Sequence, residues 1–165
     1  VVPNGFPREL PLVTETGGRI PRTGEYHVNQ TDKTLCLGSP LSLLLKLSKK
    51  PTLEGFAESC LIPYLFAISR KLKGGGPLPF GELDHGEEGL FADYLQLFGL
   101  PTRGQLIQAF RLLGMKKRRA NKLPCPCSCG KQLGRCKYNF QLREFRKIAS
   151  RKWFRSHIAY QPRAT

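Results

Sequence analysis

Apolar residues recur at helical spacing soon after a Gly-Ser-Pro run at residues 38–40. Closely spaced leucines predict a first helix over Leu41–Leu47. A longer pattern runs from residue 53 to about residue 72, and Thr52 stands where a helix N-cap is expected. Pro63 lies inside this pattern, and proline breaks or restarts a helix because it lacks an N–H group. The pattern therefore predicts a second helix that is broken or restarted at Pro63.

A further helical block begins near Glu87 and closes at Gly99, and Thr102 is placed to cap another helix over residues 103–113. The apolar positions of these two helices are Leu90, Phe91, Tyr94, Leu95, Phe98, Leu106, Ile107, Phe110 and Leu113. Two helices joined by a short turn form either an ordinary helical hairpin or a DNA-reading pair. The hairpin is the commoner outcome, and we expect it here.

A basic amphipathic helix is predicted from about Asn139 to Phe154. Its apolar face carries Phe140, Leu142, Phe145, Ile148 and Trp153. Tyr138, Phe140 and Trp153 lie among arginines and could stack on bases, but apolar residues at helical spacing favour packing contacts.

The first part of the chain has a different pattern, with short extended segments between turns. Residues 10–16 predict a strand, which Gly17-Gly18 closes. The run Tyr26-His27-Val28-Asn29 is followed by a polar loop at residues 30–33 and then by Leu35-Cys36-Leu37. Cys36 therefore comes directly after a loop.

Composition and charge divide the chain. The 165 residues are 40% hydrophobic, which is typical of a compact domain with an appendage. Residues 103–165 hold 17 lysines and arginines against one acid, Glu144, whereas the rest is nearly neutral. We expect a domain over residues 1–114 and a basic tail over residues 115–165, with the boundary near 114–122. Such a tail favours nucleic acid or an acidic protein as its partner.

The first residue, the longest apolar stretch and the cysteines indicate the cellular setting of the chain. The chain begins with Val1 rather than Met and shows no leader, so we expect a trimmed or internal sequence. Its longest apolar stretch, residues 60–68, is far shorter than the roughly 20 residues of a spanning helix, so we expect a soluble protein. Four of the six cysteines fall within twelve residues, which favours a shared metal ion over disulfides and a reducing, cytoplasmic compartment.

The clustered cysteines read Cys125-Pro126-Cys127-Ser128-Cys129-Gly130-Lys131, followed by Cys136. This run resembles the small zinc motif at the carboxyl end of SecA. That motif has eight residues between its second and third cysteines, and the same number separates Cys127 from Cys136 here. Lys137 stands where that motif has its fourth ligand. We expect Cys129 to substitute, with His157 a poorer candidate. The resemblance implies a structural Zn²⁺ on Cys125, Cys127, Cys129 and Cys136, and free thiols are the alternative.

The surroundings of Cys36 resemble ubiquitin-conjugating enzymes, in which an aromatic-proline segment, a proline-led strand and a His-Pro-Asn triplet precede a catalytic cysteine and a leucine. The matching segments here are Gly5-Phe6-Pro7, Leu10-Pro11, His27-Val28-Asn29 and Cys36-Leu37. Val28 replaces the proline and the gap to Cys36 is slightly short, which suggests a bacterial branch. The likeness covers about residues 5–72 and implies an α+β fold with an antiparallel meander.

By this resemblance, Cys36 would accept a ubiquitin-like modifier from its activating enzyme as a thioester and pass it to an amine on a target. Asn29 would donate a hydrogen bond to the oxyanion, and His27 would organise the loop. His85 is a candidate base, although a helix-entry loop is the favoured interpretation of its segment. Such proteins resemble components of bacterial antiviral defence operons.

Three other interpretations stay open. Cys36 could be a buried hydrophobic residue, as we expect for Cys60 within its helix. A non-enzymatic nucleic-acid-binding protein would combine the helices of residues 87–113 with the basic tail. A cysteine hydrolase using Cys36 and His85 ranks last, because no glycine motif for an oxyanion hole is present.

Overall fold

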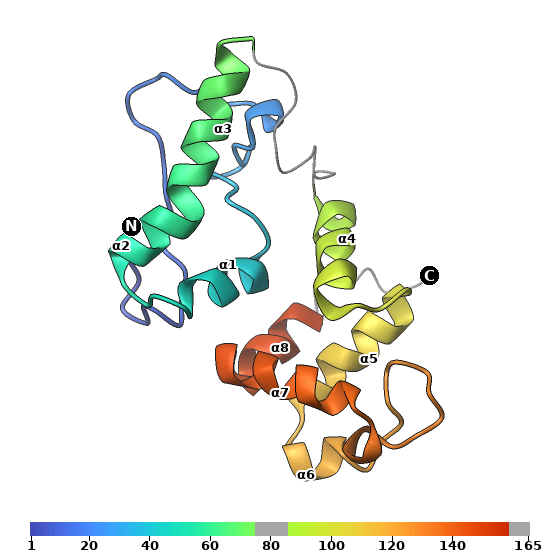
Figure 1. The fold of residues 1–165 in the computed structure, drawn as a ribbon. Coiled ribbons are helices and arrows are strands. Elements are labelled where there is room, and N and C mark those ends of the chain that lie inside the picture. The colour runs from blue at the N-terminus through green and yellow to red at the C-terminus, as the bar shows by residue number, and fades with distance from the viewer. Residues whose placement is uncertain (75–85, 159–165) are drawn as a thin grey trace. The chain divides into compact units, whose positions relative to one another are not determined.

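The computed structural model describes residues 1–74 and 86–158 (Figure 1). The chain forms two compact units, an N-terminal unit, Val1–Leu90, and a C-terminal unit, Phe91–Thr165. The second unit thus begins well before the boundary expected near residues 114–122. The charge of the chain does not mark the division, because helices that differ in charge pack together in the second unit. His85 lies outside the described residues.

The predicted antiparallel meander is wrong. Across residues 1–74 and 86–158, extended segments pair only through isolated bridges. These bridges join Thr14 to Thr34, Val28 to Leu35 and Pro124 to Gln132. Gly18 and His27 have positive φ angles of 67° and 53°, which turn the chain away from an extended path, and Pro21 offers no N–H to a neighbouring strand. The fold is therefore helical rather than α+β.

The N-terminal unit begins with extended segments and a 3₁₀ turn, η1, at Gly24–Tyr26. Its first helix, α1, spans Pro40–Leu47, where Ser39 Oγ accepts a hydrogen bond from the Ser42 amide at 3.4 Å. The cap and the proline in the first turn are both favourable at a helix start.

A second, longer helix consists of α2 (Leu53–Phe56), a π-helical turn η2 (Ala57–Leu61) and α3 (Ile62–Leu72). Thr52 Oγ1 accepts a hydrogen bond from the Gly55 amide at 3.0 Å, which confirms the predicted cap. The π turn lies directly before Pro63, where the missing N–H disturbs the regular helical hydrogen bonding. The helix is continuous because the wider turn accommodates the proline.

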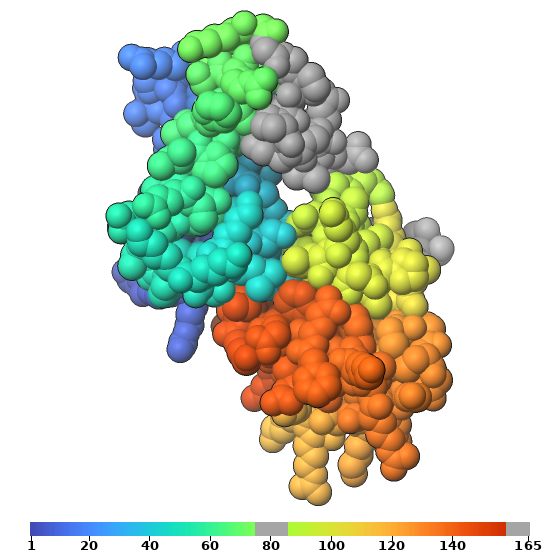
Figure 2. All heavy atoms as spheres, in the orientation of Figure 1, coloured from blue at the N-terminus to red at the C-terminus, as the bar shows by residue number. Residues whose placement is uncertain are grey.

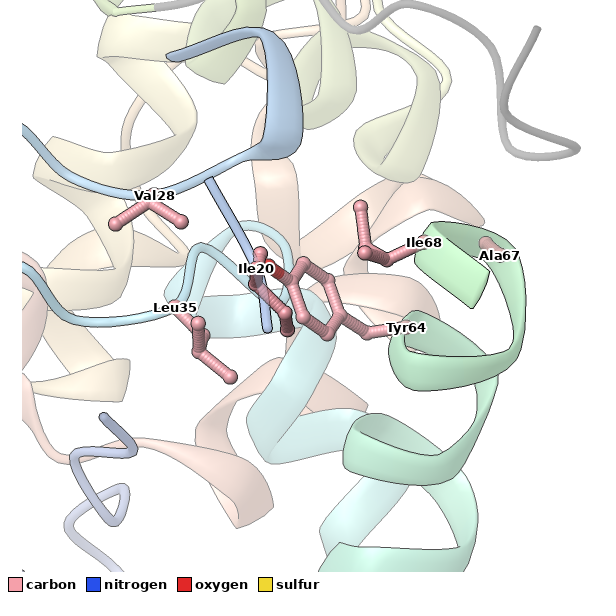
Figure 3. Packing of buried hydrophobic residues seen from close by; sticks show 6 residues of the cluster. All are labelled: Ile20, Val28, Leu35, Tyr64, Ala67 and Ile68. Atoms are coloured by element: carbon pink, nitrogen blue, oxygen red, sulfur yellow. The ribbon is translucent and has the colours of Figure 1, made fainter. Parts of the chain in front are cut away.

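The core of the N-terminal unit joins α3 to the extended segments. Figure 3 shows Tyr64 and Ile68 of α3 facing Ile20, Val28 and Leu35. The Tyr64 hydroxyl donates to the Tyr26 carbonyl at 2.8 Å, so its polar end is satisfied. A second cluster contains Leu43, Leu47, Phe56 and Cys60, and the predicted burial of Cys60 is confirmed.

The C-terminal unit consists of helices and a cysteine loop. The helices are the end of α4 (Glu87–Phe98), α5 (Arg103–Gly114), α6 (Lys117–Ala120), the 3₁₀ turn η3 (Leu133–Arg135), α7 (Tyr138–Ile148) and α8 (Arg151–Ile158). Gly99 ends α4 with a φ of 60°, and Leu100 N donates back to the Leu95 carbonyl at 3.0 Å. Thr102 caps α5 through the Gln105 amide at 3.3 Å, as predicted.

Aromatic rings fill the space between these helices, and α5 lies along α8 (Figure 1). The Phe98 ring stacks on Phe145 with centroids 4.2 Å apart, and Phe110 meets Phe154 edge-on at 5.6 Å. Such pairs add a specific geometry to the burial of apolar area.

The single basic helix predicted from Asn139 to Phe154 is two helices. Ala149 has extended backbone angles, φ −129° and ψ 151°, and Ser150 Oγ accepts a hydrogen bond from the Trp153 amide at 3.1 Å as the start of α8. Phe140 also departs from the prediction, because its side chain is 67% exposed rather than part of the packed face.

Candidate metal centre

The four clustered cysteines belong to a tight loop between α6 and α7. Cys125 N donates to the Lys131 carbonyl at 2.9 Å, and Leu133 N donates to the Leu123 carbonyl at 2.8 Å, which closes the loop as a short hairpin. At its tip, Ser128 and Gly130 adopt left-handed φ angles of 59° and 73°. Glycine takes this conformation without steric cost, so Gly130 allows the chain to turn.

This loop directs four sulfur atoms toward one point. Sγ of Cys125 lies 3.2 Å from Sγ of Cys127, and Sγ of Cys136 lies 3.6 Å from Cys127 and 3.5 Å from Cys129. All four atoms lie within 4.8 Å of one another. A tetrahedron with metal–sulfur bonds of about 2.3 Å has sulfur–sulfur edges of about 3.8 Å. The arrangement therefore has the size that a bound metal ion requires.

The environments of the four thiols differ. Cys125 is buried, Cys127 and Cys136 are half-buried and Cys129 is exposed. Burial raises the pKa of the Cys125 and Cys127 thiols. The backbone N–H of Lys131 stabilises the Cys129 thiolate and lowers its pKa to about 7. A metal ion binds thiolates, so binding at the buried cysteines would displace protons that burial otherwise retains.

Two glutamines of α5 hold the loop from outside. Gln105 Nε2 donates to Ser128 Oγ at 2.8 Å, and Gln108 Nε2 donates to the Pro124 carbonyl at 3.0 Å. Sequence reasoning missed both residues, although their spacing of three places them on one helical face. These two hydrogen bonds join α5 to the cysteine loop.

The loop also has support from the side of α7. The Tyr138 amide lies 3.4 Å from Cys136 Sγ, and the Tyr138 hydroxyl donates to the Phe98 carbonyl at 2.8 Å. Leu133, which lies between Cys129 and Cys136 in the sequence, is fully buried. The cluster is thus anchored to α4, α5 and α7 of the C-terminal unit.

Cys129 lies where it could serve as the fourth ligand of a metal ion. Cys129 lies with the other three cysteines. His157, the poorer candidate, instead stacks on Trp153 with ring centroids 3.6 Å apart, and its Nδ1 lies 2.9 Å from the Trp153 carbonyl.

Cys36 directly follows the bridge between Val28 and Leu35 in the N-terminal unit, beside the predicted His-x-Asn segment. Cys36 N donates to the His27 carbonyl at 2.7 Å, and Asn29 N donates to the Thr34 carbonyl at 2.8 Å. The Cys36 side chain is half-buried and His27 is buried. The structure therefore brings the backbones of these segments together, without the sheet that the resemblance implied.

The side chain of Asn29 is exposed and occupied within its own loop, where Nδ2 donates to Thr34 Oγ1 at 2.7 Å. Thr34 in turn donates to Asp32 at 2.7 Å, which fixes the loop between the two paired segments. The roles of Cys36, Asn29, His27 and His85 in thioester chemistry stay predictions.

Comparison with known proteins finds no matching family model, no similar curated protein and no similar solved structure. Within residues 1–74 and 86–158, no helix has the length and apolar character to cross a membrane.

Proposed function

We propose that the C-terminal unit is a nucleic-acid-binding module whose four clustered cysteines hold a structural Zn²⁺. The observation that carries this proposal is the exposure of its positive charge. Every lysine and arginine from residue 103 to residue 155, apart from Arg146, is exposed to solvent. Exposed cations that neutralise phosphates supply most of the affinity of sequence-independent nucleic-acid binding.

The donor set supports zinc as the metal. Four thiolates in a tetrahedron are typical of a structural zinc site, and a site with four protein ligands leaves no open position for catalysis. The loop over residues 123–133 has little apolar content of its own, so a metal would stabilise a segment that side-chain packing alone leaves weak. The ion thereby fixes the backbone next to α6 and α7.

The charge of the unit is almost unopposed. Glu144 is the only acidic residue after Asp93, and its carboxylate pairs with Lys147 at 2.7 Å. Lys117, Arg118 and Arg119 form most of the short helix α6, and all three are exposed. In Figure 2, long side chains of the segment around α6, coloured gold, extend away from their neighbours.

Nucleic acid fits this surface better than an acidic protein. Stable protein interfaces rely on a central cluster of apolar anchors. Among residues 91–157, the large hydrophobic side chains that are exposed are Leu123 and Phe140. A surface rich in cations and poor in apolar anchors is typical of phosphate recognition.

The test uses the full chain loaded with zinc and fluorescein-labelled oligonucleotides of about 20 residues, followed by anisotropy across a salt series. We expect the logarithm of the association constant to fall linearly with the logarithm of the salt concentration. The triple variant Lys117→Gln, Arg118→Gln and Arg119→Gln should bind less tightly and lower the salt slope by up to about three.

The matched control neutralises three exposed bases of the N-terminal unit, Lys46→Gln, Lys49→Gln and Arg70→Gln, and should bind as the wild type does. Polyglutamate serves as the acidic-protein probe. Equal affinity for polyglutamate and oligonucleotide, or an equal loss in the two triple variants, would contradict the proposal.

Thioester chemistry on Cys36 is a second candidate function. The hydrogen bond from Cys36 to the His27 carbonyl favours it, because it brings the proposed nucleophile to the His-x-Asn segment. Incubation with a bacterial ubiquitin-like protein, its activating enzyme and ATP should give a reductant-sensitive adduct. The adduct should be absent in Cys36→Ala and present in Cys60→Ala, and its persistence in Cys36→Ala would exclude this role.

A further inference from the structure

Phe140 is an aromatic side chain that the packing of its helix leaves in solvent. It lies on α7, where Leu142 and Phe145 are buried against the rest of the C-terminal unit. The Phe140 side chain is 67% exposed. Successive residues of a helix are 100° apart, so residue 140 lies well away from the buried face. A single exposed ring is unremarkable by itself, and its meaning depends on what surrounds it.

Several rings in the core of the C-terminal unit have aromatic partners. Phe98, Phe110, Phe145 and Phe154 stack or meet edge-on within the core. The indole of Trp153 is half-buried and is covered by the stacked imidazole of His157. Phe140 has a cation beside it, since the Arg143 guanidinium carbon lies 5.9 Å from its ring centroid. Phe91 has a similar contact with Arg103 at 4.7 Å, but Phe91 is half-buried whereas Phe140 is exposed.

The helical surface around Phe140 is positively charged. Lys137 lies three residues before it, Arg143 three residues after it and Lys147 seven residues after it, so all three fall on the same side of α7. Each of these side chains is exposed. Glu144 lies on this side as well and pairs with Lys147, so the net positive charge near the ring comes from Lys137 and Arg143. The surface therefore offers one flat apolar ring with cations on both sides along the helix.

We infer that Phe140 is a stacking platform for an unpaired base, and that Lys137 and Arg143 bind the phosphates next to that base. This inference rests on the proposed nucleic-acid binding and adds its substrate class, single-stranded nucleic acid. The faces of bases in a duplex are covered by their neighbours, whereas those of a single strand are free to stack on a side chain. Charge alone attracts both forms, and the ring distinguishes them.

The test measures anisotropy of zinc-loaded full chain with a labelled single strand of about 12 nucleotides and with the same sequence as a duplex, each as RNA and as DNA. The variant Phe140→Leu keeps the apolar character but removes the aromatic face. Stacking on one base corresponds to a loss of about 5- to 150-fold in single-strand affinity. Duplex affinity and the salt slope should be unchanged. Phe140→Trp should bind the single strand at least as well as the wild type.

A matched control is Phe66→Leu on α3 of the N-terminal unit, because the Phe66 side chain is 63% exposed. It should leave single-strand binding unchanged. A single strand with abasic positions should bind the wild type no better than the intact strand binds Phe140→Leu.

The outcomes separate this inference from the proposed function. Salt-dependent binding that Phe140→Leu leaves unchanged, or lowers equally for single strand and duplex, overturns the stacking role and leaves the module intact. Wild-type protein that binds neither form at any salt concentration overturns both.

Discussion

Gln105 of α5 donates a hydrogen bond to the hydroxyl of Ser128 at 2.8 Å and so joins a helix to the tip of the cysteine loop. The same glutamine accepts a hydrogen bond from the hydroxyl of its N-cap, Thr102, at 3.0 Å. The start of α5 and the turn between Cys127 and Cys129 are therefore coupled through one side chain. Supporting contacts of this kind orient the ligands of a metal site.

Gln105→Ala should loosen the loop without unfolding the unit. Its hydrogen bond is neutral and exposed, so we expect a loss of about 0.5–1 kcal/mol in unfolding free energy. Zinc affinity should also fall, since supporting contacts orient the ligands. Competition with a chromophoric zinc chelator measures that affinity. Gln96→Ala, at an exposed position of α4, is the control, and equal affinities in the two variants would contradict the coupling.

Metal removal should destabilise the C-terminal unit. One zinc ion per chain is expected by elemental analysis, and a chelator should lower the melting temperature until zinc is restored, because the ion is bound only by the folded loop. Cys127→Ser should abolish this response, whereas Cys36→Ser should retain it. With cobalt in place of zinc, Cys129→Ser should show weaker sulfur-to-metal absorption than the wild type. Unchanged absorption in that variant would remove Cys129 from the ligand set.

Features set by neighbouring residues could be predicted from the sequence. The caps Thr52 and Thr102 were identified because a cap depends on contacts within one helical turn. The cysteine cluster was recognised for a similar reason, since its ligands fall within twelve residues and one hairpin brings them together. In both cases the chain between the interacting atoms is too short for distant packing to intervene.

Features set by distant pairing could not be predicted. The segment over residues 10–16 has the composition of a strand, but a strand forms only where a partner runs beside it. Here Thr14 pairs with Thr34 through one isolated bridge, and helix α3 covers the other extended segments. A short likeness around Cys36 carries no information about that pairing.

The break between α7 and α8 shows a third limit. Apolar residues continue at helical spacing across Ala149, so periodicity predicts one helix. Ser150 starts a new helix, because its hydroxyl accepts a hydrogen bond from the Trp153 amide. A single serine within a basic run is a weak sequence signal for such a start. The break lets Phe154 pack against Phe110, a contact that only the packed structure reveals.

The pH dependence of the N-terminal unit should reflect Tyr64. Burial raises the pKa of Tyr64 to about 12, and the nearby Cys36 and Glu15 act in the same direction. The unfolded chain loses this proton near pH 10, so the folded state is disfavoured as the pH rises from about 10 to about 12. The loss is at most about 2–3 kcal/mol, since each pKa unit corresponds to about 1.4 kcal/mol.

Tyr64→Phe should remove this pH dependence. It should also cost about 1 kcal/mol near neutral pH, because the Tyr26 carbonyl loses its donor. Denaturant unfolding at several pH values measures both effects. Tyr26→Phe is the control, because its ring is only half-buried. A steeper loss of stability at alkaline pH in Tyr64→Phe than in the wild type would contradict the assignment.

Arg146 is a base of the C-terminal unit that serves the fold, as does Arg155, which donates to the Gly114 carbonyl at 3.1 Å. The Arg146 guanidinium donates to the carbonyls of Leu112 at 2.6 Å, Leu113 at 3.0 Å and Met115 at 3.1 Å, at the end of α5. The last carbonyls of a helix have no partner within the helix, and a cation there also interacts favourably with the helix dipole. Burial lowers the pKa of Arg146, yet arginine stays protonated at neutral pH.

Arg146→Met should therefore destabilise the unit by about 2–3 kcal/mol, because it keeps the apolar stem but leaves three carbonyls without their charged donor. Arg146→Lys should recover only part of this, since a single ammonium cannot reproduce the planar fork. Arg143→Met, at an exposed position of the same helix, should change stability by no more than about 0.5 kcal/mol. Denaturant unfolding of the zinc-loaded chain separates the cases. Equal unfolding free energies for Arg146→Met and Arg143→Met would contradict a structural role for Arg146 and would group it with the nucleic-acid-binding cations.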